Sequence, residues 1–145
     1  MLRKVRRLSE MESGDRIALV ELLVLSFAIR TGLIFVPLPK LAAFLSVRPG
    51  SFLAHILVGF RQVSCTRLAE LAELAARLSG KRARCLIRSL ALFSTMKARG
   101  ESAKLLIGVN KTNLSLEAHA WVETNKTVVG DSIETTERFA TLVRL

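Results

Sequence analysis

The sequence has no tyrosine and only one tryptophan, two histidines, two cysteines and three prolines. Without tyrosine, a dense basic stripe on one expected helix or a recognised nucleic-acid motif, the chain is a poor match to a nucleic-acid-binding protein. Two cysteines are too few for a disulfide framework, which favours a reducing, cytoplasmic compartment. Gly80-Lys81 lacks the other residues of a phosphate-binding loop, and we expect neither a cofactor nor a metal ion.

Acidic residues are also scarce, because 12 Asp and Glu stand against 22 Lys and Arg and give a net charge of +10. This balance predicts an acidic partner or surface. The chain has 145 residues, 50% of them hydrophobic, which indicates one folded domain over residues 1–145 and argues against disorder. The acidic residues Glu10, Glu12 and Asp15 follow a basic start, which is a poor match to a signal peptide.

The longest apolar run covers residues 16–36. A membrane-spanning helix needs roughly 20 apolar residues, but Glu21 and Arg30 interrupt this run. A charge near the bilayer centre costs roughly 2.5–3.5 kcal/mol on insertion scales. We therefore expect a buried helix of a soluble protein that ends near Thr31-Gly32, with a helix on the membrane surface as the alternative.

Helices are expected before strands along this chain, which is the order of an α+β fold. Apolar residues recur at helical spacing in 38–45, 65–79 and 85–100, and Gly80 and Gly100 follow the last two. After residue 100 the pattern changes to strands over 104–109, 114–124 and 127–131, and a last strand or helix is expected within 133–145. The three central strands predict an antiparallel meander.

Both cysteines are expected at the start of a helix, Cys65 in 65–79 and Cys85 in 85–100. The positive end of a helix dipole and its unpaired N–H groups favour the thiolate, which is the nucleophilic form of cysteine. Cys85 also follows the basic link Lys81-Arg82-Ala83-Arg84. The commoner fate of a cysteine is burial as a small hydrophobic residue, so only partners elsewhere in the chain can distinguish Cys65 from Cys85.

A cysteine nucleophile needs a base, and the base needs a group that orients it. His119 lies in the middle of the expected strand 114–124, and Asp131 lies on the next strand. Residues directly opposite in an antiparallel pair share a face, so His119 faces Asp131 only with a three-residue turn or a bulge. A two-residue turn at Asn125-Lys126 would direct Asp131 to the other face and count against it.

Four segments resemble one family of enzymes: Cys85-Leu-Ile-Arg-Ser-Leu-Ala-Leu, Ile107-Gly-Val, Glu117-Ala-His-Ala-Trp-Val-Glu, and Asp131. In this order they resemble the transglutaminase-like leader peptidases of lasso peptide biosynthesis. The resemblance implies a papain/transglutaminase-like fold, in which a helical part over 16–80 precedes a catalytic core over 81–145. It also implies acyl transfer to Cys85, with His119 as base and then acid and Asp131 as the residue that orients His119.

The resemblance further implies a ribosomally made precursor peptide as the substrate, cut between its leader and core. We expect a separate leader-recognition protein as a partner, since no winged-helix module fits before residue 16, and a cyclase that closes the macrolactam. The ATP requirement of such pathways is assigned to the cyclase.

Two other functions fit parts of the sequence. One is a different transglutaminase-like acyl transfer or peptidase specificity, and the other is a non-catalytic basic adaptor at a membrane or an acidic protein. Arg82, Arg84 and Arg88 are expected either to meet acidic groups of the leader or partner, or to form a solvated face. Trp121 is expected on the same strand face as His119, as a core aromatic or as a shield for the imidazole.

Overall fold

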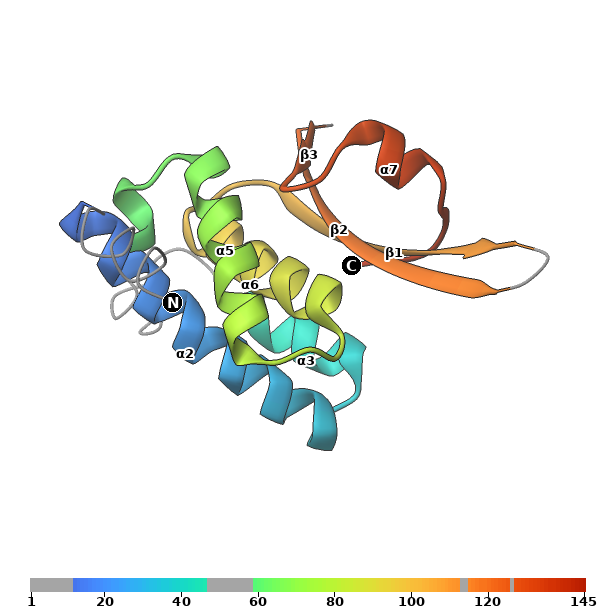
Figure 1. Ribbon diagram of the computed structural model, residues 1–145, viewed down its shortest axis with the longest axis horizontal. Helices are drawn as coiled ribbons and strands as arrows, with labels where there is room; N and C mark the ends of the chain where they lie inside the picture. Colours follow the sequence, from blue (N-terminus) through green and yellow to red (C-terminus); the bar gives the residue numbers. More distant parts are fainter. Residues whose placement is uncertain (1–11, 47–58, 113–114, 126) are drawn as a thin grey trace, which may run out of the picture.

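The computed structural model describes residues 12–46, 59–112, 115–125 and 127–145. Helices form one side of the molecule and an antiparallel sheet forms the other (Figure 1). The elements are α2 (Ser13–Phe35), α3 (Leu38–Leu45), η1 (Gly59–Gln62), α5 (Cys65–Ser79), α6 (Arg84–Ala98), β1 (Ala103–Lys111), β2 (Leu116–Thr124), β3 (Thr127–Val129), α7 (Ile133–Glu137) and β4 (Ala140–Arg144).

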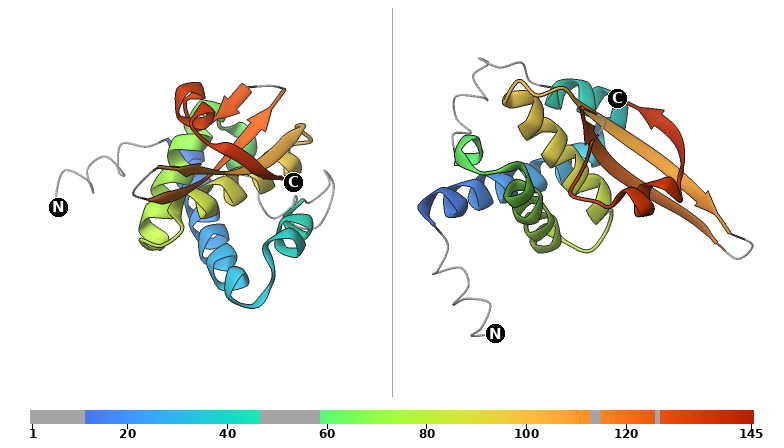
Figure 2. Two further views of the ribbon diagram at one scale, coloured as in Figure 1. Left: turned by 90° about the vertical axis from the view of Figure 1, so that its right-hand side faces the viewer. Right: turned by 90° about the horizontal axis from the view of Figure 1, so that it is seen from above.

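The sheet has the strand order β3-β2-β1-β4, and all of its pairs are antiparallel. This arrangement confirms the predicted α+β fold. The last part of the chain forms both a short helix and a strand, and β4 returns to pair with β1 (Figure 2). The predicted strand 127–131 is too long, since β3 ends at Val129. Leu114, at the predicted start of the middle strand, lies outside the described residues.

Helix α2 does not end near Thr31-Gly32, as the sequence predicts, but continues to Phe35. Glycine inside a helix costs about 1 kcal/mol relative to alanine. Here it allows α3 to approach closely, because a Cβ atom at Gly32 would lie 3.1 Å from Leu41 Cδ1. Pro37 then stops the helix and serves as the N-cap of α3.

One side of α2 is buried against η1, α5 and α6, and the other side is exposed. Ala18, Leu19, Leu22, Ser26 and Ile29 are buried. The expectation of a buried helix therefore holds for one side only. The helix is also long and apolar enough to cross a membrane, with a mean hydropathy of 2.1, a property that core helices of soluble proteins share. Its large exposed apolar residues are Ile17, Val20, Val24, Phe27, Ile34 and Phe35.

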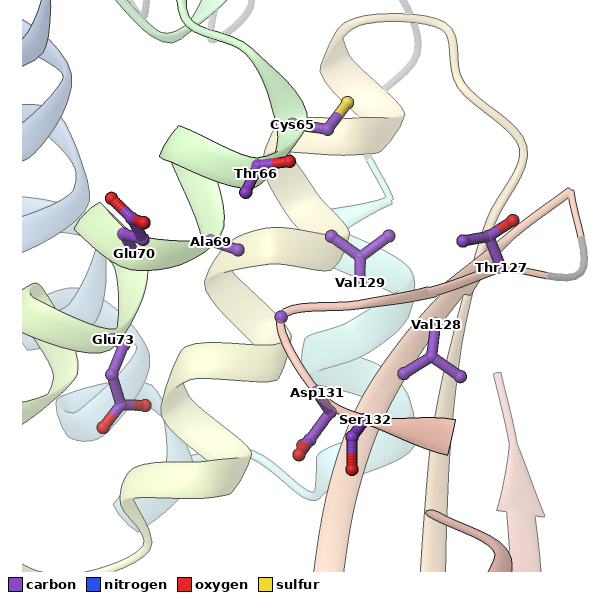
Figure 3. Close-up of a pocket in the computed structure, with 11 residues that line it drawn as sticks. Cys65, Thr66, Ala69, Glu70, Glu73, Thr127, Val128, Val129, Asp131 and Ser132 are labelled. Carbon is purple, nitrogen blue, oxygen red and sulfur yellow. The ribbon is translucent and has the colours of Figure 1, made fainter. Parts of the chain in front are cut away.

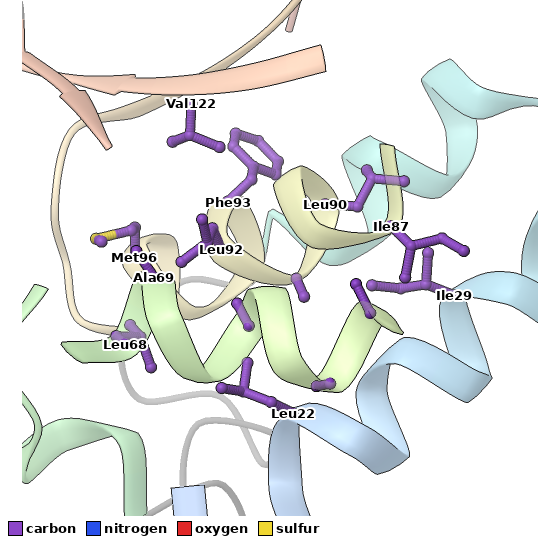
Figure 4. Close-up of a cluster of buried hydrophobic side chains, with 14 of the residues drawn as sticks. Leu22, Ile29, Leu68, Ala69, Ile87, Leu90, Leu92, Phe93, Met96 and Val122 are labelled. Carbon is purple, nitrogen blue, oxygen red and sulfur yellow. The ribbon is translucent and has the colours of Figure 1, made fainter. Parts of the chain in front are cut away.

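Helix α6 is at the centre of the hydrophobic core, between α5 on one side and the sheet on the other (Figure 4). Its residues Ile87, Leu90, Leu92 and Phe93 are almost completely buried. The buried side of helix α5 is rich in alanine, whose small side chain allows neighbouring helices to pack closely. Helix α6, which carries Cys85, is therefore fixed by contacts with helices and with the sheet.

Phe93→Ala tests the importance of this packing. Phe93 is 1% exposed, and its loss leaves a cavity that α5 and the sheet cannot close. We expect the free energy of unfolding to fall by about 3–5 kcal/mol. Urea denaturation would measure the change, with Phe27→Ala as the control, because Phe27 is 51% exposed. Equal effects of the two variants would contradict the assigned core.

Candidate active site

His119 lies at the centre of β2, and its side chain is 17% exposed. Two aromatic rings flank the imidazole: Trp121 is stacked at 6.2 Å and Phe139 is tilted at 5.1 Å between ring centroids. Gly108 pairs with His119 across the sheet, and a Cβ atom there would lie about 3 Å from both Trp121 and Phe139. The glycine thus allows both rings to pack beside His119 and limit the access of water. Trp121 is buried and its ring stacks beside the imidazole, while its role as a shield stays a prediction.

Asp131 contacts His119 directly, with 2.7 Å between Asp131 Oδ2 and His119 Nε2. An ionised carboxylate can only accept a hydrogen bond, so Nε2 carries the hydrogen and Nδ1 is the basic nitrogen. Among the described residues, Nδ1 has no hydrogen-bond partner. This is the arrangement that a general base requires, because the carboxylate fixes the tautomer and leaves one nitrogen free to accept a proton.

The prediction of a three-residue turn or a bulge before Asp131 is wrong, although Asp131 does contact His119. Thr124 pairs with Thr127, so the loop has two residues and no bulge. The sequence predicts Asp131 within the strand, where a two-residue turn would direct its side chain to the other face. Instead the strand ends at Val129, and Gly130 adopts a left-handed conformation with φ of 73°. The chain bends at Gly130, and the Asp131 side chain reaches His119 from outside the strand.

Gly130→Ala is expected to move Asp131. The positive φ is strained for alanine, and the new Cβ atom would lie 3.1 Å from Ala69 Cβ. We expect a loss of about 1 kcal/mol or more in the free energy of unfolding and a slower reaction of Cys85 with iodoacetamide. Gly32→Ala is the control, since Gly32 lies within a helix far along the chain from this bend. An unchanged rate in a folded Gly130→Ala protein would show that the bend does not position Asp131.

Cys85 is the second residue of α6 and is half-buried. Its sulfur makes no hydrogen bond to a described residue, so the structure joins His119 to Asp131 but does not join Cys85 to His119. The first turns of α6 are nevertheless anchored beside His119 and Asp131. Ser89 Oγ donates to the carbonyl of Ala120, which is next to His119, and Arg88 binds Asp131. Cys85 lies three and four residues before these anchors, on the same helix face.

The start of α6 leaves backbone donors available. The N-cap residue is Ala83, with a left-handed φ of 53° and no side-chain hydrogen bond to the helix. The first turn of a helix has N–H groups without intrahelical partners, and they point toward the N-terminal end. The N–H of Cys85 is therefore placed to stabilise an oxyanion formed by attack of its own sulfur.

Arg88 is the residue that the sequence analysis misassigned. It was expected to meet acidic groups of a leader or partner, or solvent, but its side chain is only 12% exposed. Its guanidinium lies 2.6 Å from Asp131 Oδ2 and 3.2 Å from Glu73 Oε2. The sequence did contain a signal that Arg88 lies near the site, because Arg88 follows Cys85 by one helical turn. Arg82 and Arg84 are exposed, and their role remains a prediction.

Glu73 is the second acidic residue that binds Arg88. Burial alone would raise the pKa of Glu73, but the hydrogen bond from Arg77 and the charges of Arg88 and Arg77 outweigh it and lower that pKa. Ionised Glu73 therefore stabilises the folded chain at neutral pH, and this contribution is lost as the pH falls through the folded-state pKa. Arg88 is held from both sides, by Glu73 and by Asp131.

Cys65 has a different environment. It is exposed at the start of α5, 3.6 Å from Arg99 Nη1 and 3.8 Å from Glu101 Oε1. None of these contacts involves a histidine that could accept its proton. The described residues also contain no cluster of His, Cys, Asp and Glu that could hold a metal ion. The two cysteines thus differ in environment: Cys65 contacts Arg99 and Glu101, whereas Cys85 lies one helical turn before the arginine that binds Asp131. The choice of Cys85 as the nucleophile stays a prediction.

A cysteine at a helix start, a histidine on a strand and an aspartate hydrogen-bonded to that histidine are the residue types that can transfer acyl groups through a thioester. Residues 59–144 match the model of the transglutaminase-like superfamily, from η1 to β4, and the match includes Cys85, His119 and Asp131. The chain belongs to the transglutaminase-like superfamily, which indicates a cysteine peptidase or acyltransferase type of activity. Searches of curated proteins and of solved structures found no match.

Proposed function

We propose that the protein is a cysteine peptidase that removes the leader from a ribosomally synthesised lasso precursor peptide. Cys85, His119 and Asp131 are the proposed catalytic residues. The hydrogen bond between His119 Nε2 and Asp131 carries this proposal, because it leaves Nδ1 as the base beside the helix that bears Cys85. The lasso assignment rests on the sequence resemblance around Cys85 and His119.

In the proposed reaction, His119 Nδ1 takes the proton of Cys85, and the sulfur attacks the carbonyl carbon of the scissile peptide bond. The N–H of Cys85 stabilises the oxyanion of the tetrahedral intermediate. His119 then donates its proton to the leaving nitrogen, the C–N bond breaks, and a thioester remains. Water adds to the thioester with His119 again as base, which releases the leader acid and restores the thiol.

Asp131 holds the tautomer of His119 and stabilises the imidazolium during both steps. The Trp121 and Phe139 rings exclude water from one side of the imidazole, which strengthens its interaction with the carboxylate. No step requires a metal ion or a cofactor.

The proposed partners are the precursor peptide, a separate leader-recognition protein, and a cyclase that uses the freed amine, all in the cytoplasm. The exposed apolar side of α2 supports a protein partner, because large apolar patches on a single chain usually mark interaction sites. An adaptor function at a membrane would use the same side of α2 without requiring Cys85.

The decisive experiment combines the purified protein, the leader-recognition protein and the precursor peptide in water enriched in ¹⁸O, followed by mass spectrometry. A peptidase produces two fragments and places one ¹⁸O atom in the new carboxylate. A related acyltransferase, which the superfamily also permits, would instead join the acyl fragment to an added amine such as hydroxylamine in preference to water. An intact precursor with every component present would contradict the lasso assignment.

A further inference from the structure

A groove of about 600 Å³ lies between α5 and the segment that contains β3 and Asp131. Figure 3 shows Cys65, Glu70 and Glu73 on the helix wall, with Val128 and Asp131 on the opposite wall. The floor includes the small side chain of Ala69 and the apolar side chain of Val129. The proposed reaction uses Asp131 from this set, and Glu73 acts only through its ion pair with Arg88; the other lining residues have no role so far.

One end of the groove shares Asp131 with the candidate active site, whereas Cys85 and His119 are not among its lining residues. Glu73 and Asp131 line that end, and both bind Arg88, which is one helical turn from Cys85. The other end is at Cys65, eight residues earlier on α5. A helix rises about 1.5 Å per residue, so the helix wall is about 12 Å long. An extended peptide advances about 3.3 Å per residue, and about four residues fit.

One wall of the groove is a strand edge that no other described strand pairs with. Within the part of the chain that the structure describes, β3 is at the end of the sheet and pairs only with β2. Thr124 and Thr127 close a two-residue hairpin, so they form a hydrogen-bonded pair, and the next residue, Val128, directs its N–H and C=O away from β2. Val128 also lines the groove, so an extended peptide there finds one donor and one acceptor.

The charges of the groove favour an uncharged peptide segment. Three carboxylates line it, but each already binds an arginine from outside the lining: Glu70 binds Arg67, Glu73 binds Arg77 and Arg88, and Asp131 binds Arg88. The remaining contacts available to a ligand are hydroxyl groups, the edge of β3 and the apolar floor.

We propose that this groove binds about four residues of the substrate peptide, next to its scissile bond, as an extra strand on the free edge of β3. This proposal rests on the proposed peptidase function and identifies where that function recognises an uncharged, extended stretch of the substrate. The strand at the other end of the sheet is β4, and none of its residues lines this groove.

Alkylation of Cys85 by three kinds of reagent tests the proposal. A tetra-alanine chloromethyl ketone places its peptide before the reactive carbon, and a chloroacetyl tetra-alanine amide places it after. In each, the thiolate sulfur forms a C–S bond and chloride leaves. Iodoacetamide reports on the thiolate without using the groove. Every protein compared carries Cys65→Ala, so that only Cys85 reacts and any effect of this change on the far end of the groove is shared by all of them.

We expect at least one peptide reagent to react about tenfold faster, relative to iodoacetamide, than its mono-alanine counterpart. Val128→Pro removes the outward N–H at an edge position where proline is tolerated, and should reduce this advantage about five- to tenfold. Val128→Ala keeps the N–H and is the matched variant. Thr66→Trp, an exposed position on the helix wall, should fill the groove and have the same effect as Val128→Pro.

Failure of the groove proposal and failure of the proposed peptidase function would give different results. If iodoacetamide still reacts fast with Cys85 but neither peptide reagent responds to Val128→Pro or Thr66→Trp, the groove proposal is wrong and the peptidase proposal stands. If iodoacetamide itself finds no reactive Cys85, the proposed function fails first.

Discussion

Replacing Cys85 by alanine is expected to abolish cleavage of the precursor peptide, with a fall in rate of about 10⁴-fold or more. The same substitution at Cys65 is expected to lower the rate by a much smaller factor, because Cys65 lines only the far end of the groove and the nucleophile remains. Both cysteines begin a helix, so the dipole and the free N–H groups act on both. Only Cys85 lies on the helix face that is anchored beside His119 and Asp131.

Comparing Cys85→Ala with Cys65→Ala therefore tests where the cysteine lies relative to His119 and Asp131. It does not test the effect of a helix start in general. Both variants should unfold at similar urea concentrations, which excludes misfolding as the cause. Cleavage that survives in Cys85→Ala, or that is lost equally in Cys65→Ala, would remove Cys85 from its proposed role.

Arg88→Leu is expected to reduce the activity by about 100-fold while leaving Cys85, His119 and Asp131 in the chain. Arg88 and Asp131 are 12% and 13% exposed, so the substitution leaves a nearly buried carboxylate without its cation. Breaking a buried pair in this way costs about 3–5 kcal/mol of stability. Asp131 would then lose the contact that holds it against His119, and the imidazole would lose its fixed orientation.

Arg88→Lys separates charge from geometry. Lysine keeps the positive charge but cannot bridge Glu73 and Asp131 with a planar fork, so we expect intermediate activity. The measurement should be made well below the unfolding temperature of each variant, with kcat and KM determined separately. A purely structural role would lower stability and leave kcat and its pH profile unchanged, and this result would contradict the role of Arg88 as a positioning residue.

Much of the fold was predictable because local signals agreed with one another. The helix 65–79 has a leucine and alanine stripe, a serine that caps its start and a glycine at its end, and the structure has the same bounds. The change from helical to strand periodicity after residue 100 predicted the order of helices and sheet. These features depend on residues close together in the chain.

The errors arose where distant segments decide the conformation. Gly32 is a helix-stop signal by itself, but packing of Leu41 against it keeps the helix continuous. Asp131 was placed by counting residues along a strand, whereas the strand ends early and Gly130 turns the chain. The glycine before Asp131 was visible in the sequence, but its positive φ was not.

Arg88 shows a third kind of limit. Charged residues on a helix are usually solvated, and apart from its spacing of one turn from Cys85 the sequence does not distinguish Arg88 from Arg82 and Arg84. Its burial follows from Glu73 on the neighbouring helix and Asp131 after β3, which the fold brings to the same place. Pairs of this kind join residues that are far apart in the chain, and the sequence alone does not show them.

The most direct test of the proposed catalytic site is the rate of Cys85 alkylation by iodoacetamide as a function of pH, in the wild-type chain and in His119→Ala, with Cys65 as the internal control. An unperturbed cysteine thiol has a pKa of about 8.5. We expect Cys85 to react faster than Cys65 at neutral pH and to lose this advantage in His119→Ala. If both cysteines respond to pH in the same way and His119→Ala changes neither, Cys85 and His119 do not act together, and the adaptor function becomes the better explanation.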